Sequence, residues 1–222
     1  MTNLDMQELN FGEMPIGEIA VRFPGATAIF RKHKLDYCCG GGISLTAAVE
    51  RRGIVLADIE RQLVELIPQP IDLPDDPDRI IDLIIARYHD THRRELPELI
   101  QLARRVERVH AEHPGVPKGL AEFLEQINAN LGSHMQKEEL VLFPMIRAGH
   151  PMVSAPIAAM QAEHVDHGES LEELAALTHD MQPPDGACGS WRALYSGARK
   201  LSNDLSDHIH IENNILFPQF IG

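Results

Sequence analysis

The chain contains little cysteine, few aromatic residues and no long hydrophobic run. Three of its 222 residues are cysteine, and two of these are adjacent. We therefore expect no disulfide framework, and a reducing cytoplasm is the expected compartment. No apolar run approaches the roughly 18 residues that a membrane-spanning helix needs. The first residues are acidic and lack a basic segment followed by an apolar core, so we expect no signal peptide.

Basic side chains are also scarce. The 20 lysines and arginines are outnumbered by 33 aspartates and glutamates, which gives a formal net charge of −13. This balance argues against nucleic acid and against an anionic membrane surface as partners. Histidine is abundant, with 12 residues. Hydrophobic residues make up 44% of the chain, enough for one large or two small cores.

The histidines belong to a duplicated pattern. HMQKEELVLFP at 134–144 and HIHIENNILFP at 208–218 each place a His four residues before a Glu and end on Leu-Phe-Pro. On a helix, this spacing projects both side chains from one face, about 6 Å apart along the axis. HDTH at 89–92 is similarly matched by HVDH at 164–167, and the two offsets are 75 and 74 residues. The pattern predicts two similar halves, each with two helices, that close into a four-helix bundle.

Turn signals divide the chain into two predicted domains. Short helical patterns run from Ile16 to about Leu66, with Ser44 as an N-cap and Gly53 as a C-terminal stop, and a proline-rich linker follows. Four long helices then run from Asp76-Pro77 to His110, from Pro117 to Pro144, from Ser154 to Thr178 and from Ser190 to Phe217. Pro97 should kink the first of these. The fold class is all-α, with a small helical domain at 1–72, a bundle at 73–222 and no strand.

Ionisable residues interrupt the apolar stripe of every long helix. Several buried imidazoles and two buried carboxylates would each cost several kcal/mol if nothing compensated them. Divalent metal does so, and mixed imidazole and carboxylate ligation suits iron, manganese or zinc. Two carboxylates able to bridge suggest two metals. The alternative is a metal-free bundle with hydrogen-bonded His–Glu pairs.

The position of a residue around its helix, which we call its phase, does not identify every ligand. His92 and His167 lie on the stripes beside His89 and His164, and the phase does not choose between the members of each pair. Glu139 and His210 fall off the stripes, and we expect them to be solvated. The histidines near predicted helix ends or in loops should be capping or solvated; these are His33, His110, His113, His150 and His179.

The chain resembles the family of di-iron proteins for the repair of iron centres, of the YtfE and ScdA type, which carry a hemerythrin-like domain. The resemblance rests on RYHDTHRRELPEL, SHMQKEELVLFPMI, MQAEHVDHGE and DHIHIENNILFP in the bundle, and on FRKHKLDYCCGG in the N-terminal part. It covers almost the whole chain. The fold that it implies is a hemerythrin-like four-helix bundle preceded by a small helical domain.

The resemblance implies a non-haem centre of two irons, joined by an oxo or hydroxo bridge. Its ligand pattern falls on six residues: His89, His134, Glu138, His164, His208 and Glu212. The two glutamates would bridge the irons. The implied role is the repair, in the cytoplasm, of iron–sulfur clusters damaged by nitric oxide or oxidative stress. The partners would be damaged iron–sulfur proteins, with nitric oxide or dioxygen as small ligands, and a homodimer is a further expectation.

The adjacent Cys38 and Cys39 lie in a glycine-rich turn. They are either a structural turn or redox and transfer groups, because adjacent cysteines close only a strained, reducible disulfide. A hemerythrin-type protein that binds or senses dioxygen or nitric oxide is the alternative function, but it has no use for such a pair. A ferritin-like oxidase would use Glu-x-x-His instead. The pattern leaves open an enzymatic activity of the nitric oxide reductase kind.

Overall fold

The computed structural model describes residues 10–23, 26–37, 40–64 and 74–221. The chain forms two compact units, one made of Met1–Leu73 with Ile209–Gln219, the other of Pro74–His208 with Phe220–Gly222. The described residues hold helices and no strand, since the one isolated β-bridge joins Pro15 and Ser44. The all-α prediction is therefore confirmed. No helix in these ranges is both long and apolar enough to cross a membrane.

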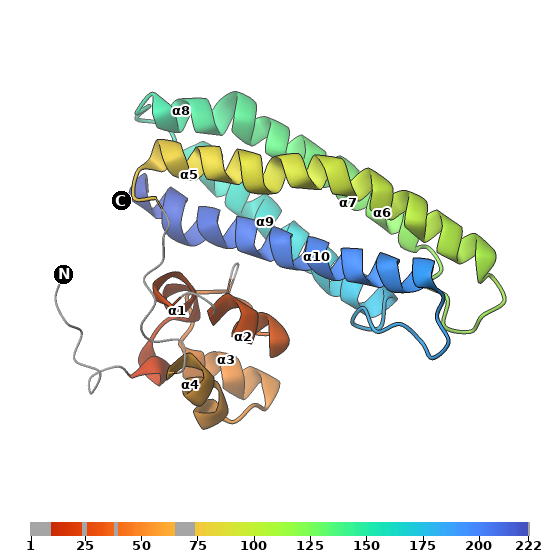
Figure 1. Cartoon of the computed structure of the whole chain (residues 1–222). Coiled ribbons are helices and arrows are strands. Elements are labelled where there is room, and N and C mark those ends of the chain that lie inside the picture. Colours follow the sequence, from red (N-terminus) through yellow and green to blue (C-terminus); the bar gives the residue numbers. More distant parts are fainter. Residues whose placement is uncertain (1–9, 24–25, 38–39, 65–73, 222) are drawn as a thin grey trace. The chain divides into compact units, whose positions relative to one another are not determined.

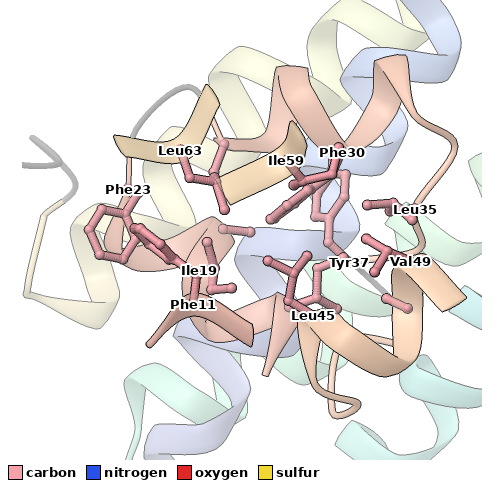
Figure 2. Packing of buried hydrophobic residues seen from close by; sticks show 14 residues of the cluster. Phe11, Ile19, Phe23, Phe30, Leu35, Tyr37, Leu45, Val49, Ile59 and Leu63 are labelled. Atoms are coloured by element: carbon pink, nitrogen blue, oxygen red, sulfur yellow. The ribbon is translucent and has the colours of Figure 1, made fainter. Parts of the chain in front are cut away.

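The N-terminal part of the first unit consists of short helices around one apolar cluster. They are η1 (Phe11–Glu13), α1 (Ile16–Arg22), α2 (Ala26–Lys32), α3 (Leu45–Arg52) and α4 (Leu56–Val64). Phe11 and Phe23 meet edge to face at 5.0 Å between ring centroids. Phe30 and Tyr37 lie 5.9 Å apart in the same cluster (Figure 2). Burying such rings is the main favourable term available to so small a core.

The predicted ends of α3 are confirmed. The Ser44 hydroxyl accepts a hydrogen bond from the backbone N–H of Ala47, which satisfies one of the donors left open in the first helical turn. At the other end, Gly53 adopts the left-handed conformation, with φ of 66°. This conformation costs little only for glycine, so the helix ends there.

Long helices make up the second unit (Figure 1). The first consists of α5 (Pro77–Ile84), the π turn η2 (Ile85–His89) and α6 (Asp90–Val109). The second consists of α7 (Leu120–Lys137), the π turn η3 (Glu138–Leu142) and α8 (Phe143–Arg147). The third is α9 (Ser154–Leu177). The fourth is α10 (Gly189–Ile211), followed by the π turn η4 (Glu212–Leu216) and by η5 (Phe217–Gln219). The last residues of this helix, Ile209–Gln219, are grouped with the first unit.

The long helices differ at two points from what Asp76-Pro77 and Pro144 would suggest: an aspartate before the first turn is a common cap, and a proline after a helix is a common stop. Pro77 occupies the first turn of α5 as predicted, but the side chain of Asp76 accepts no capping hydrogen bond. Helix α8 contains Pro144 in its first turn, so the second long helix continues past the proline that was expected to end it. Since η3 runs directly into α8, this proline lies inside a continuous helix and leaves it without one backbone N–H donor. Helix α6 likewise runs through Pro97 without ending.

Candidate metal centre

Six fully buried side chains converge inside the bundle. His89, His164, His208, Glu138 and Glu212 are 0% exposed, and His134 is 1% exposed. They form two groups of four, and in each group one ligand atom from every residue lies within 4.8 Å of those of the other three. One group is His89, Glu138, His208 and Glu212; the other is His134, Glu138, His164 and Glu212. We call these the first and second sub-sites.

Glu138 faces both sub-sites. Its Oε2 atom lies 3.4 Å from Nε2 of His89, and its Oε1 atom lies 3.3 Å from Nε2 of His134. Helix α7 supplies His134 one turn before Glu138, so a single helix presents an imidazole and a carboxylate to the same point. A carboxylate with one oxygen toward each sub-site is suited to bridging two ions.

The imidazoles meet in pairs. Nε2 of His89 lies 3.1 Å from Nε2 of His208, and Nε2 of His134 lies 3.1 Å from Nε2 of His164. Two ring nitrogens aimed at each other do not both donate, but each can offer a lone pair to a cation between them. The donor set therefore fits metal: each sub-site offers two buried imidazoles and two buried, shared carboxylates, a mixture that suits iron.

Two further carboxylates fix the orientation of one imidazole in each sub-site. Nδ1 of His89 lies 2.7 Å from Oε1 of Glu139, whose other partner is the guanidinium of Arg93 at 2.8 Å. A carboxylate on the far ring nitrogen fixes the tautomer and leaves Nε2 as the lone-pair donor. The expectation that Glu139 is solvated was wrong: its side chain is 25% exposed and is held from two sides.

The second sub-site repeats this arrangement with residues from other helices. Nδ1 of His134 lies 3.1 Å from Oε2 of Glu163, and Oε1 of Glu163 accepts from Nζ of Lys137 at 2.6 Å. Burial by itself would raise the pKa of Glu163, but the hydrogen bonds from Lys137 and His134 outweigh it and lower that pKa. Sequence reasoning missed Glu163, because the contact joins α9 to α7 and no spacing along the chain encodes it.

His92 and His167 are buried beside the sub-sites but belong to neither group of four. His92 is 2% exposed, with its ring centroid 5.8 Å from that of His208. His167 is 5% exposed and 4.9 Å from His134. Burial, followed by the neighbouring imidazoles, lowers the pKa of each to about 3. Both are therefore neutral at physiological pH, and Nε2 of each has no hydrogen-bond partner among the described residues.

His210 corrects a second expectation. It is 4% exposed rather than solvated, and burial lowers its pKa to about 4. Within the first unit, its ring packs edge-on against Tyr37 at 5.2 Å, and its Nδ1 lies 3.1 Å from Nδ2 of Asn214. His210 points away from the bundle stripe, as the phase predicted, but the face it occupies is covered by another element.

The remaining histidines lie outside the centre. His150 and His179 are exposed, whereas His33, His110 and His113 are half-buried. Nδ1 of His113 and of His150 each accepts a hydrogen bond from a backbone N–H two residues further on, a capping role. Cys38 and Cys39, the candidates for redox or transfer chemistry, lie outside the described residues.

Comparisons with known proteins match both parts of the chain. The model of the hemerythrin HHE cation binding domain matches residues 81–220. The ScdA_N model, a domain of unknown function, matches residues 12–67. An iron–sulfur cluster repair protein, YtfE, of Citrobacter koseri is 47% identical over 218 residues, covering 96% of this chain and 99% of the relative. The protein of the same name from Escherichia coli is 47% identical over 216 residues, covering 96% and 98%.

Proposed function

The chain belongs to the family of YtfE iron–sulfur cluster repair proteins and carries the hemerythrin HHE cation binding domain, and from this we propose that it repairs damaged iron–sulfur clusters through a centre of two irons. The observation that carries the proposal is the pair of sub-sites that share Glu138 and Glu212. The substrates would be iron–sulfur proteins damaged by nitric oxide or by oxidants. Iron bound in the two sub-sites would supply a reactive redox centre with exchangeable ligand positions.

The residues themselves favour release as well as binding. His89 and His134 would each hold one iron, with Glu139 and Glu163 keeping their rings in the ligating tautomer. The shared carboxylates would hold both irons at once, so moving one of them loosens a bond in each sub-site. Four protein donors per iron leave positions for exogenous ligands, which a reactive or donating site requires.

We further propose that the chain divides its work between an N-terminal domain at residues 1–72, which carries the two adjacent cysteines, and a bundle at residues 73–222, which holds the iron. Cys38 and Cys39 would exchange thiol or metal with the client protein. A reducing cytoplasm would keep them as thiols. Replacing both by Ser should leave the iron-to-protein ratio unchanged, because neither belongs to the donor groups, yet abolish repair in cells exposed to nitric oxide. Full complementation by the double variant would exclude a role for the thiols.

Iron transfer tests the function directly. The protein is loaded with ⁵⁷Fe, reduced, and mixed with a hydro-lyase whose cluster has been damaged by nitric oxide, with sulfide supplied. We expect ⁵⁷Fe to appear in the hydro-lyase as its activity returns. Glu138→Ala should give neither result, whereas Glu122→Gln, at an exposed position of α7, should behave as the parent chain. If both irons stay bound while dioxygen binds reversibly, the protein is a hemerythrin-type binding protein.

A further inference from the structure

A thiol and an imidazole meet where α6 ends and α10 begins. Sγ of Cys188 lies 3.1 Å from Nε2 of His110. His110 directly follows α6, Cys188 directly precedes α10, and both side chains are half-buried. Neither residue belongs to the donor groups of the metal centre. A thiol that donates a hydrogen bond to an imidazole can pass its proton to that base, which is how many cysteine nucleophiles are activated.

The pair is remote from the metal centre. Cys188 precedes His208, a donor of the first sub-site, by 20 residues (208 − 188), and α10 is continuous between them. At a rise of about 1.5 Å per residue, this is about 30 Å along the helix axis. Chemistry at the thiol of Cys188 therefore proceeds without contact with the irons.

Cys188 is also the N-cap of a long helix. Its backbone carbonyl accepts a hydrogen bond from the backbone N–H of Arg192 at 3.1 Å, as an N-cap residue does. Helix α10 then runs for 23 residues. The partial positive charge at the N-terminus of such a helix stabilises a negative charge placed beside it. A thiolate formed at Cys188 is thus supported by the helix as well as by the protonated imidazole.

Packing holds the imidazole in place. The ring of His110 lies 5.0 Å from that of Trp191, which is 1% exposed in the first turn of α10. His113 packs against the same indole at 5.1 Å, but it does not line the pocket described next. The chain therefore contains two imidazoles in similar packing, and the hydrogen bond to sulfur is made by His110.

A pocket of about 350 Å³ is lined by the thiol–imidazole pair. Val106 and Val109 supply apolar surface to its lining, and Arg105 supplies a cation. Val109 is 61% exposed, so apolar surface beside the thiol is open to a ligand. The volume lies in the range of sites that bind small organic molecules. The thiol of Cys188 thus faces a space that accommodates more than a diatomic molecule.

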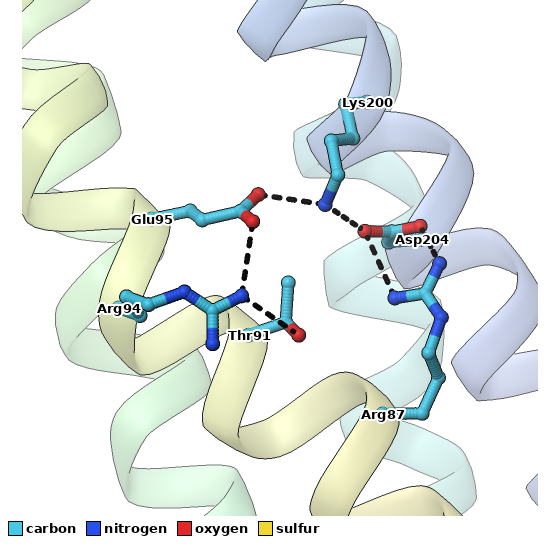
Figure 3. Close-up of polar contacts among 6 residues, drawn as sticks. All are labelled: Arg87, Thr91, Arg94, Glu95, Lys200 and Asp204. Carbon is cyan, nitrogen blue, oxygen red and sulfur yellow. Dashed lines mark hydrogen bonds and ion pairs between the residues drawn. The ribbon is translucent and has the colours of Figure 1, made fainter.

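The cation in this pocket is unpaired, unlike others on the same helices. Lys200 donates to Asp204 and to Glu95, each at 2.7 Å, and Arg94 donates to Glu95 at 3.2 Å (Figure 3). Arg105 is exposed and forms no ion pair with any residue that the structure describes. Its charge is therefore available to a ligand, and it favours an anionic one.

We propose that Cys188 is a thiol–disulfide exchange site for a small anionic disulfide of the glutathione disulfide class. The thiol proton passes to Nε2 of His110, and Sγ of Cys188 attacks one sulfur of the bound disulfide. The disulfide bond breaks as the bond to Cys188 forms, and the departing thiolate takes up the proton from His110. One thiol and one disulfide give one mixed disulfide and one free thiol, so no other oxidant is consumed. The site is independent of the proposed function and adds to it a response to an oxidised thiol pool.

Mass spectrometry of the iron-loaded full chain tests the site. The chain has three cysteines, so replacing both Cys38 and Cys39 by Ser leaves Cys188 as its only thiol. With glutathione disulfide, in the absence of oxygen, we expect one glutathionyl group per chain, located on Cys188 by peptide mapping. If the double variant does not fold, the mapped peptides of the parent chain decide. An unmodified Cys188 in the parent chain would refute the proposal.

The rate of this modification tests the imidazole. An ordinary thiol is only a few per cent ionised at pH 7, so His110→Gln should slow the reaction about tenfold at that pH. The slowing should shrink at about pH 9.5, where a thiol ionises without a base. His113→Gln, which alters the other imidazole on Trp191, should keep the parent rate. Equal rates for His110→Gln and the parent chain at pH 7 would show that the imidazole does not activate the thiol.

The charge of the disulfide tests the pocket. Glutathione disulfide is anionic, hydroxyethyl disulfide is uncharged and cystamine is cationic, and each rate is divided by that of a small free thiol with the same disulfide. We expect the anionic disulfide to rank first by severalfold. Arg105→Gln should remove this ranking, whereas Arg108→Gln, also exposed on α6 but outside the lining, should keep it. If cystamine ranks with glutathione disulfide in the parent chain, the pocket does not select anions and the proposal fails. If His110→Gln does not fold, as judged by circular dichroism, this ranking decides alone.

Discussion

The metal-free protein should lose stability in acid because its interior holds imidazoles that must stay neutral. The pKa of His167 is about 3 in the folded chain, against 6.5 for an ordinary histidine. The unfolded chain therefore takes up a proton below pH 6.5 that the folded chain refuses until about pH 3. Stability from this group is fully present above pH 6.5 and declines as pH falls toward 3. His92 and His210, whose pKa values are lowered to about 3 and about 4, act in the same direction.

The size of the effect follows from proton linkage. Between the two pKa values, each such histidine lowers the free energy of unfolding by about 1.4 kcal/mol per pH unit of acidification. Over the whole interval, one histidine contributes at most about 5 kcal/mol, which is a large part of the 5–15 kcal/mol by which domains are typically stable. The three histidines act in the same direction, so the metal-free protein should become progressively less stable as pH falls below 6.5.

The test compares how steeply the free energy of unfolding falls with pH in each variant, because replacing a buried side chain also changes its absolute value through packing. Urea unfolding of the metal-free protein is followed by circular dichroism at pH 7.5, 5.5, 5.0 and 4.5. Between pH 5.5 and 4.5, His167→Leu should lose about 1.4 kcal/mol less than the parent chain. His179→Asn, at an exposed position, should keep the parent slope. If His167→Leu and the parent chain share one slope, His167 is not a neutral buried group and the reasoning fails.

Three further outcomes follow from the contacts. Glu138→Ala should lose both irons by metal analysis, because one carboxylate oxygen of Glu138 faces each sub-site. His210→Ala, outside both donor groups, should retain both. One iron left in Glu138→Ala would contradict the sharing of Glu138 between the two sub-sites. Glu139→Gln should weaken iron binding about 10–100-fold in chelator competition, with Glu122→Gln as its exposed control and an unchanged affinity as the contrary result. Ser44→Ala should lower stability by about 1 kcal/mol in urea unfolding, and a loss near zero would show that the cap contributes nothing.

Much of the bundle could be predicted because its signals are local. The duplicated His-x-x-x-Glu pattern fixes which side of a helix carries each donor, and apolar residues at steps of three and four fix that this side is inward. In α7, Leu124, Ile127 and Leu131 are buried on the same stripe as His134. Helix phase left open the choice between His89 and His92 and between His164 and His167, which only the resemblance to known di-iron proteins made; the six residues that it implied are the ones that the structure brings together in two groups. Ser44 and Gly53 were equally readable, since a cap depends on neighbours within one turn.

Contacts between helices were not readable in this way. Glu163 reaches His134 from α9, and the sequence separation of 29 residues carries no periodic signal. Glu139 lies off the stripe of its own helix, which suggested solvent, but its neighbour there is His89 of another helix. Helix phase predicts on which face of a helix a side chain lies, but it does not predict whether another helix or solvent covers that face. His210 shows the same limit, because Tyr37 covers the face that phase assigned to water.

The π turns explain the one systematic error in the stripes. Steps of three and four residues continued past Glu138 and Glu212 would place Val141 and Ile215 inside, but Val141 is 51% exposed and Ile215 is only half-buried, while Leu142 and Leu216 are buried in their place. A π turn adds one residue to a helical turn, so every later residue shifts by one position. Such turns begin at Glu138 and at Glu212, and a third ends at His89. The extra residue lets a donor face the centre while the apolar rows before and after it both face the core, which a uniform helix does not allow. Helix α9, which supplies His164, is a single α-helix from Ser154 to Leu177 and needs no such adjustment. Three of the four helices thus carry their irregularity at a donor residue, the position at which regular helical periodicity must fail if the centre is to form.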